Sequence, residues 1–406
     1  MRRSIAVTGT CLALVWALFS NISYAKDEAA EHLAAAQSLA KRLLIVDTHI
    51  DVPYRIYDHW ADVTAATSGG DFDYPRARAG GLDIPFMSIF VPWQNEADGA
   101  AFALANRLID QVEAIAGRAP ERFAVVYDPQ QARAAATAGR IALAMGMENG
   151  APVAGSLDNL RHFYRRGIRY ITLTHAKSNH IADSSYDPVP LWQGLSPFGR
   201  QVVAEMNRLG IMVDVSHLSD PAIVEVLQVS AAPVIASHSS ARHFTPGWQR
   251  NISDELISGV AAGGGVIMIN FGSTFIKQQT NEYYTRFAVA RDALKAQLGV
   301  EDDDEPRVAA FTADYREKFP FPYATVEDVA DHIDHVVKIA GIDYVGLGSD
   351  FDGVGDSLPS DLKDVSMYPN LIAVLLARGY RENDLEKILG GNLLRVWETV
   401  TRQAAP

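Results

Sequence analysis

Cysteine is nearly absent from this sequence. Its 406 residues include a single cysteine, Cys11, which lies in an apolar N-terminal stretch. We expect this stretch to be removed, which would leave the mature chain without cysteine. Such a chain has no disulfide, no thiol nucleophile and no thiolate ligand for a metal ion. Any metal site in the mature protein would therefore use histidine and carboxylate side chains.

The apolar N-terminal stretch is too short to favour a membrane span. Residues 5–19 follow the positively charged start Met1-Arg2-Arg3, and Ser23-Tyr24-Ala25 places small residues where a signal peptidase recognises them. A span needs ~20 apolar residues. We therefore expect residues 1–25 to be a signal peptide, and the protein to be periplasmic or secreted without an integral membrane span. An uncleaved anchor and a twin-arginine signal are the alternatives.

Positively charged side chains are outnumbered. The 36 lysines and arginines against 49 acidic residues give a net charge of −13. An acidic surface argues against nucleic acid or an anionic membrane as a partner and is ordinary for an exported enzyme. At 48% hydrophobic residues, the chain can bury a large core, and we expect residues 26–406 to form one domain. A homodimer is compatible with this composition.

Eight apolar runs are typical of buried β-strands. They begin near Leu43, Ile84, Ile141, Tyr170, Ile211, Pro233, Val266 and Tyr344. Helical stretches are predicted between most of them, at 98–117, 157–167, 197–209, 221–229, 254–262 and 325–340. This alternation predicts parallel α/β architecture, and eight repeats close a (β/α)8 TIM-type barrel. An open doubly wound sheet is disfavoured because no glycine-rich phosphate loop follows the first strand.

Residues 272–323, between the seventh strand and the following helix, form a long insertion. A connection needs far fewer residues, so a segment of this length is a lid, a subunit contact or surface decoration. We favour decoration or a contact over an active-site lid.

Six of the apolar runs lead into a histidine or an acid. A reactive or metal-binding residue at the carboxyl end of a parallel strand is where barrel enzymes place their chemistry. We therefore expect these side chains to converge on one pocket: His49 with Asp51, Glu148, His175, His217, His238 and Asp350.

Five of these residues form a set of metal ligands. His49 and Asp51 lie two positions apart, on the same side of an extended backbone. With Glu148, His217 and His238 they supply three imidazoles and two carboxylates, a set suited to zinc, manganese or cobalt. One catalytic zinc typically takes three protein ligands. Two ions about 3.5–4 Å apart, bridged by Glu148 and a hydroxide, would use all five.

Six short motifs follow one another along the chain: Asp47–Asp51 (DTHID), Tyr170–His175 (YITLTH), Val213–His217 (VDVSH), Pro233–Ala241 (PVIASHSSA), Gly348–Val354 (GSDFDGV) and Gly391–Val396 (GNLLRV). In these motifs and in their order, the sequence resembles the membrane (renal-type) dipeptidases from about Leu43 to Val400. The resemblance implies a barrel with two zinc ions that hydrolyses dipeptides. It places His49 and Asp51 on one ion and His217 and His238 on the other, with Glu148 bridging.

Three further residues match positions of that family. The resemblance implies that His175 hydrogen-bonds the oxyanion. It implies that Asp350 holds the substrate amino group and carries a proton to the leaving nitrogen. Arg250 would bind the substrate carboxylate with its planar pair of donors. Gly272 departs from the pattern, because animal members carry an aromatic residue there, and Asn179-His180 departs as well; both put substrate preference in doubt.

Two other groups of residues resemble functional sites, a histidine pair and two adjacent serines, but we assign no function to either. His332 and His335 lie three residues apart on the predicted helix 325–340 and resemble a ligand pair, but we interpret them as structural. Ser239 and Ser240 lack the Gly-x-Ser-x-Gly turn of a serine hydrolase.

The sequence therefore predicts an exported zinc metalloprotease that cleaves dipeptides with free termini, through a hydroxide that attacks the peptide carbonyl. Another dinuclear amidohydrolase, acting on N-acyl amino acids or cyclic amides, is the first alternative. Arg250 and Asp350 argue against it because together they require two free termini. A non-catalytic peptide-binding relative is the second alternative, and the complete ligand set argues against that one.

Overall fold

The computed structural model describes residues 29–300, 303 and 305–405. The expected signal peptide, residues 1–25, lies outside the described residues. Residues 29–40 are helical and precede the first strand. Within the described part of the chain, no helix has both the length and the apolar character needed to cross a membrane.

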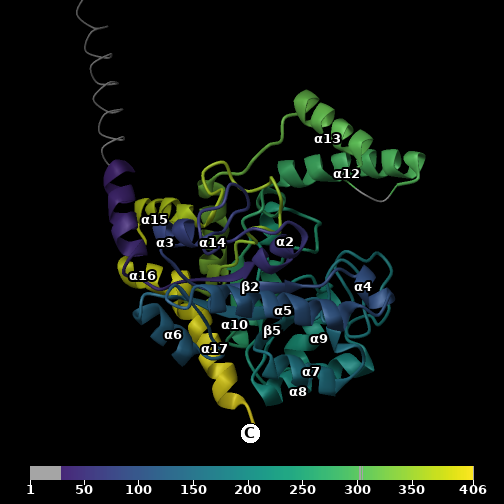
Figure 1. The fold of residues 1–406 in the computed structure, drawn as a ribbon, viewed down its shortest axis with the longest axis horizontal. Coiled ribbons are helices and arrows are strands. Elements are labelled where there is room, and N and C mark those ends of the chain that lie inside the picture. The colour runs from purple at the N-terminus through teal and green to yellow at the C-terminus, as the bar shows by residue number, and fades with distance from the viewer. Residues whose placement is uncertain (1–28, 301–302, 304, 406) are drawn as a thin grey trace, which may run out of the picture.

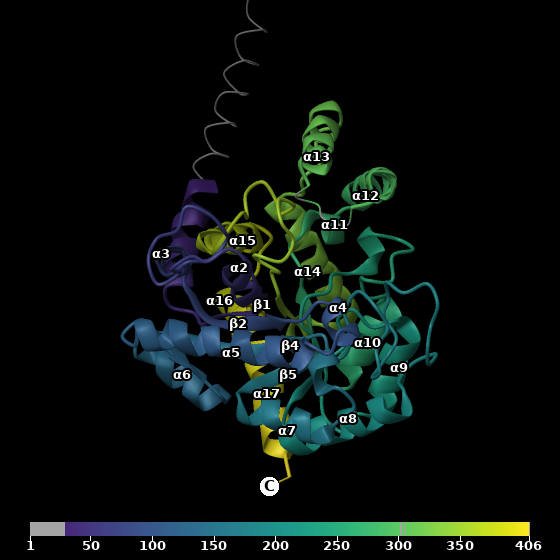
Figure 2. The ribbon, with the colours of Figure 1, turned by 45° about the vertical axis from the view of Figure 1, so that its right-hand side comes forward.

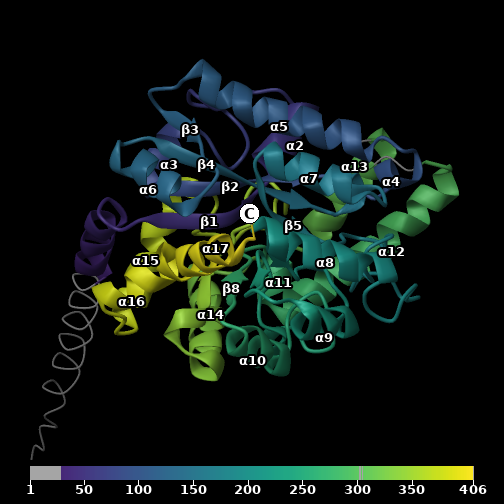
Figure 3. The ribbon, with the colours of Figure 1, turned by 90° about the horizontal axis from the view of Figure 1, so that it is seen from below.

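Eight parallel strands close into a barrel, as predicted. They are β1 (Ile45–Ile50), β2 (Leu82–Phe90), β4 (Ile141–Glu148), β5 (Ile168–Thr172), β6 (Met212–Asp214), β7 (Ile235–Ala236), β8 (Val266–Ile269) and β9 (Val345–Leu347). Neighbouring strands pair in the order β2-β1-β9-β8-β7-β6-β5-β4, and the pairing of β2 with β4 closes the ring. Figure 3 shows this ring with its surrounding helices.

A short strand that the sequence analysis missed, β3 (Phe123–Val125), lies beside the barrel. It pairs with the first three residues of β4, whereas β2 pairs with β4 from Ala144 to Glu148. β3 and β2 therefore pair with the first and second halves of β4, one after the other along the strand. Three residues carry too little periodicity to mark a strand in the sequence.

The six predicted helices are present as α5 (Ala101–Arg118), α7 (Leu157–Arg165), α8 (Pro197–Leu209), α9 (Asp220–Val229), α10 (Asp254–Ala262) and α14 (Val326–Ala340). Local signals set their ends. The Ser196 side chain caps α8 by accepting from Gly199 N, Pro197 starts the helix, and Gly210 ends it in the left-handed conformation. Helices outside the prediction are α2 (Val52–Asp58), α3 (Tyr74–Gly80), α4 (Gln94–Ala97), α6 (Pro129–Thr137), α15 (Tyr368–Ala377), α16 (Glu382–Glu386) and α17 (Asn392–Gln403).

The barrel interior is a packed core of its own. Its buried residues include Val46, Phe86, Tyr170 and Met268, and α17 adds Trp397, whose ring meets that of Phe86 at 5.1 Å. Figure 3 shows α17 crossing one end of the barrel, the end at which the strands begin. Because the amino-terminal end of the barrel is closed, the carboxyl ends of the strands are left for a functional site.

The long insertion forms three helices: α11 (Ser273–Ile276), α12 (Gln278–Leu298) and α13 (Pro306–Lys318). Helices α12 and α13 project from the barrel as a pair (Figures 1 and 2). Aromatic side chains join them, with the rings of Phe287 and Tyr315 5.3 Å apart. Helix α11, in contrast, is buried against the barrel.

Candidate metal centre

The five predicted metal ligands come together at the carboxyl ends of the strands. His49 and Glu148 lie in the last residues of β1 and β4, and Asp51 follows β1 directly. His217 and His238 lie in the loops just after β6 and β7. All five side chains are buried.

The backbone around this cluster is strained. His217 and Asp350 have φ angles of +67° and +64°, in the left-handed region that residues with a Cβ rarely adopt. Each such residue costs on the order of 1–3 kcal/mol and persists only where the surrounding structure enforces it. Strained residues of this kind gather at functional sites, and here both point toward the same cluster.

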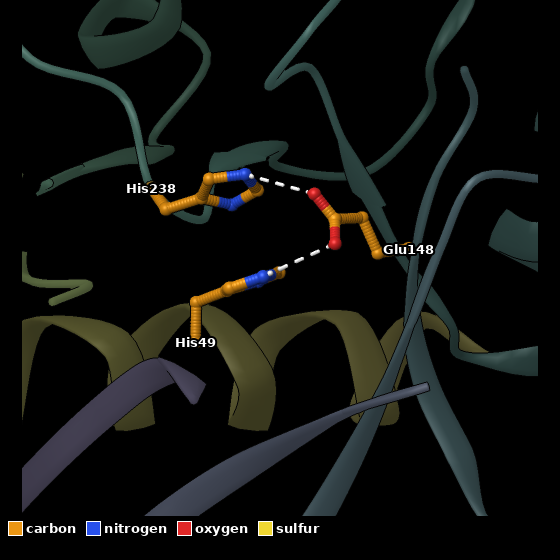
Figure 4. A group of neighbouring side chains, drawn as sticks. All are labelled: His49, Glu148 and His238. Atoms are coloured by element: carbon orange, nitrogen blue, oxygen red, sulfur yellow. Dashed lines mark ion pairs between the residues drawn. The ribbon is translucent and has the colours of Figure 1, made fainter. Parts of the chain in front are cut away.

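Glu148 lies at the centre of the cluster. One of its oxygens, Oε1, is 3.0 Å from His217 Nε2 and 3.2 Å from His238 Nε2. The other, Oε2, is 3.4 Å from His49 Nε2, which in turn is 3.3 Å from Asp51 Oδ2. Figure 4 shows His49 and His238 each facing a different oxygen of Glu148. The carboxylate is therefore placed between two pairs of ligands.

These separations fit donor atoms that share an ion. Donors bound at about 2.0–2.1 Å to one tetrahedral zinc lie roughly 3.3 Å from each other. His49 Nε2 and both carboxylate oxygens of Asp51 are buried and have no hydrogen-bond partner, although His49 Nε2 and Asp51 Oδ2 lie within ion-pair distance of each other. A buried carboxylate without a partner is costly, and a divalent cation would satisfy it. The residues present therefore fit a metal centre.

The protonation of the two loop histidines also fits. Burial lowers the pKa of His217 well below its ordinary value, and the Arg250 guanidinium lowers it further. The pKa of His238 is likewise lowered well below its ordinary value, by burial and by His49. Neutral imidazoles keep the lone pair that a metal ion needs. The Nε2 atoms of these two histidines face each other at 2.9 Å.

Residues that the sequence analysis missed hold the ligands in place. Tyr170 Oη lies 2.8 Å from His49 Nδ1. Ser237 Oγ lies 2.6 Å from His238 Nδ1 and donates to Asp214 Oδ2. Such contacts to the second ring nitrogen fix the orientation and tautomer of a ligand histidine. The sequence gives little indication of this role, because Tyr170 and Asp214 lie within predicted β-strands.

Asp350 and His175 lie beside the cluster. Asp350 Oδ1 is 4.0 Å from His49 Nε2, and Oδ2 accepts a hydrogen bond from Asn270 at 2.7 Å. Burial raises the pKa of Asp350 to about 7, with a further contribution from the nearby carboxylates. His175 is partly exposed, and its Nε2 is 3.5 Å from Glu148 Oε1. Asn270 is a further contact that the sequence analysis did not identify.

Arg250 is a buried cation beside the cluster. It is only 2% exposed, and no carboxylate of the described residues lies within ion-pair distance of its guanidinium. Nη1 donates to Ser239 Oγ at 2.7 Å, Nη2 donates to the His238 carbonyl at 3.0 Å and also lies 3.0 Å from His217 Nε2, whereas Nε has no partner. The ring of Phe275, from α11, lies 5.0 Å from the guanidinium carbon. A buried charge in this state favours an anionic ligand.

The remaining candidates from the sequence have structural partners. His332 is buried, accepts from Ala241 N at 3.0 Å and lies 3.0 Å from the Ile276 carbonyl. Ser239 is bonded to Arg250 and Ser216, and Ser240 donates to the Asn270 carbonyl. Neither serine is placed as a nucleophile.

A family model described as membrane dipeptidase (peptidase family M19) matches residues 33–406. The chain belongs to the membrane dipeptidase family. The resemblance found in the sequence is thereby confirmed, and the chain is a dipeptidase of a metallopeptidase family. The match spans both the barrel and the insertion.

Relatives and solved structures agree with this assignment. The chain is 35% identical to dipeptidase tcpJ of Claviceps purpurea, over 83% of this chain and 71% of the relative. It is 33% identical to an uncharacterized dipeptidase of Schizosaccharomyces pombe, over 89% of this chain and 82% of the relative. The probable dipeptidase PvdM of Pseudomonas aeruginosa superposes with a TM-score of 0.78 at 29% identity, covering 92% of this chain and 100% of that one. A Rhodobacter sphaeroides metallopeptidase bound to a phosphinate mimic of L-Ala-D-Ala superposes with a TM-score of 0.72 at 25% identity. The superposition covers 88% of this chain and 99% of that one.

Proposed function

We propose that this membrane dipeptidase family member uses two zinc ions to hydrolyse dipeptides whose amino and carboxyl termini are both free. The observation that carries the proposal is the buried Arg250, a cation without an acidic partner, on the same cluster as the buried acid Asp350. A dipeptide zwitterion offers the two opposite charges across a short span. The family assignment supports a dipeptide as the substrate.

His49 and Asp51 would hold one zinc ion, and His217 and His238 the other. Glu148 would bridge them, because each of its oxygens faces a different pair of ligands. When bound, the two ions lower the pKa of water and polarise the scissile carbonyl. Tyr170 and Ser237 keep the rings of His49 and His238 oriented toward the ions.

Arg250 would bind the substrate carboxylate. A guanidinium has five N–H donors, and three of those on Arg250 face Ser239, the His238 carbonyl and His217 Nε2. The donors that remain, including the unpartnered Nε, would bind the carboxylate. Phe275 covers the guanidinium and excludes water from it.

Asp350 would bind the substrate amino group and transfer a proton to the leaving nitrogen. A carboxylate at this position can accept a proton from the attacking water and pass it to the leaving nitrogen. Asn270 holds one of its oxygens and leaves the other facing the cluster. His175, at the rim of the site, would donate a hydrogen bond to the oxyanion.

A substrate panel tests this function. The purified protein should cleave free dipeptides, L-Ala-D-Ala among them, and chelation should abolish the activity. N-acetylated and C-amidated versions of the same dipeptides should be cleaved ~10²–10⁴ times more slowly, because each leaves a buried charge unpaired. Equal rates on N-acetylated dipeptides would support an amidohydrolase of N-acyl amino acids instead.

We also propose that residues 1–25 direct export to the periplasm or the medium. Cell fractionation, with and without these residues, tests the location. Size-exclusion chromatography of the purified protein tests whether the chain forms a homodimer.

A further inference from the structure

A second group of histidine and carboxylate side chains lies close together outside the barrel. It consists of His243 in a short 3₁₀ turn (Arg242–Phe244), Asp254 at the first position of α10, and His335 on α14. One ligand atom of each lies within 4.8 Å of the other two. Helices α10 and α14 are neighbours in the outer layer (Figure 3). Three separate elements therefore bring these side chains together.

His335 is in contact with both other members of the group. His335 Nε2 lies 2.8 Å from Asp254 Oδ1. The rings of His243 and His335 are stacked, with centroids 4.4 Å apart and planes 20° from parallel. The Asp254 carboxylate adds the negative charge that attracts a cation.

We propose that His243, Asp254 and His335 bind one divalent transition-metal ion, with zinc as the physiological ligand. Two imidazoles and one carboxylate form a ligand set that zinc accepts, with water at the open position. His335 and Asp254 are already adjacent, and the exposed His243 ring can rotate from the stack to complete the site.

The charges around the group favour a cation. The nearest guanidinium on the same turn, Arg242, is neutralised by Asp220 through two bonds of 2.6 and 2.7 Å. The Asp254 side chain is 40% exposed and that of His335 is 10% exposed. Because water reaches the site, we expect it to bind zinc more weakly than the buried cluster in the barrel.

The position of the site suggests what it does. His243 lies in the loop between β7 and α10, and the same loop carries Arg250. A bound ion would join this loop to α10 and α14, beside the existing bond from Ala241 N to His332. Occupancy should therefore stabilise the fold and lower KM for dipeptides more than it changes kcat. The expected decrease in KM rests on the proposed role of Arg250 in binding the substrate. The expected binding of one additional ion does not depend on that role.

The experiment counts ions on the intact holoenzyme. Protein loaded at the barrel cluster and freed of excess metal is titrated with Zn²⁺ by calorimetry, and Tm is measured with and without the added ion. The wild type should bind one additional ion per chain and show a higher Tm. His243→Ala, an exposed position that should not disturb folding, should lose both effects while retaining the ions of the barrel and its kcat. His335→Ala should behave in the same way.

A matched control uses another exposed histidine beside an acid. His59 Nε2 lies 3.3 Å from Asp58 Oδ2, and its side chain is 79% exposed, but it belongs to none of the metal-binding groups among the described residues. His59→Ala should bind the additional ion as the wild type does. The proposal is overturned if the wild type binds no ion beyond those of the barrel, or if His243→Ala binds the additional ion unchanged. A lost ion with unchanged KM would overturn only the link to Arg250.

Discussion

Replacing Arg250 by methionine should remove the preference of the enzyme for a free carboxyl terminus. Methionine keeps an unbranched, flexible apolar side chain and removes the charge. In the structure, the buried guanidinium of Arg250 donates to Ser239 and the His238 carbonyl and lies 3.0 Å from His217 Nε2, and no acid among the described residues pairs with it. The substrate carboxylate would thus be the partner that neutralises it.

The magnitude follows from the bonds that are lost. A hydrogen bond to a charged group contributes about 1.5–3 kcal/mol, and a carboxylate accepts two from a guanidinium. Each 1.36 kcal/mol is tenfold in rate, so the loss in kcat/KM should be ~10²–10⁴ for a free dipeptide. The same dipeptide with an amidated terminus lacks the charge and should lose far less.

The assay measures kcat/KM for both enzymes on both substrates, at equal metal content. The wild type should prefer the free acid over the amide by ~10²–10⁴, and Arg250→Met should cleave the two at similar rates. Arg250→Lys keeps the charge without the planar pair of donors and should fall between them. If Arg250→Met still prefers the free acid by the wild-type factor, another group binds the carboxylate and the reasoning is refuted.

Three further predictions concern the cluster. Elemental analysis of protein dialysed free of weakly bound metal should find two zinc ions per chain, and His217→Ala or His238→Ala should lose at least one; full occupancy in both variants would contradict the ligand assignment. Asp350→Asn should retain both ions while kcat falls at least ~10²-fold, the usual effect of losing a general acid–base group, and near-normal turnover would move that role elsewhere. The third prediction concerns the metal-free protein, where burial raises the pKa of Asp350 from 3.8 to about 7. The folded state then holds a proton that the unfolded state releases, so the carboxyl lowers stability progressively from pH 4 to pH 7, by up to about 4 kcal/mol. Asp350→Asn should therefore raise Tm relative to the wild type at pH 8 and not at pH 4, as thermal unfolding in chelator will show.

Much of the fold could be predicted because its signals are local. The eight barrel strands are near-continuous apolar runs, and six helices between them show clear periodicity and caps. The reactive residues follow the strands directly, so the parallel arrangement alone brings them to one end of the barrel. Their assignment to metal and substrate stays a prediction. The three-residue β3 is too short to show a periodic pattern, and the helices α2, α3, α4, α6, α15, α16 and α17 were missed as well.

Which side chains support the site was decided by tertiary structure. Tyr170 reaches His49 across 121 positions of sequence, and Asn270 reaches Asp350 across 80. These contacts depend on the register of strands that are distant in the chain, which no local pattern records. Among the residues that the structure describes, no acid pairs with Arg250, and this too depends on how the chain folds around it.

The two histidines of α14 also show the difference between what sequence spacing indicates and what tertiary packing decides. The sequence alone pairs His332 with His335, because they lie three residues apart on one helix. In the fold, His332 is bonded to the backbone of Ala241 and Ile276, and His335 meets His243 and Asp254 instead. Sequence spacing determines which residues share a helix face, but packing against α10 and the β7–α10 loop determines which of them meet.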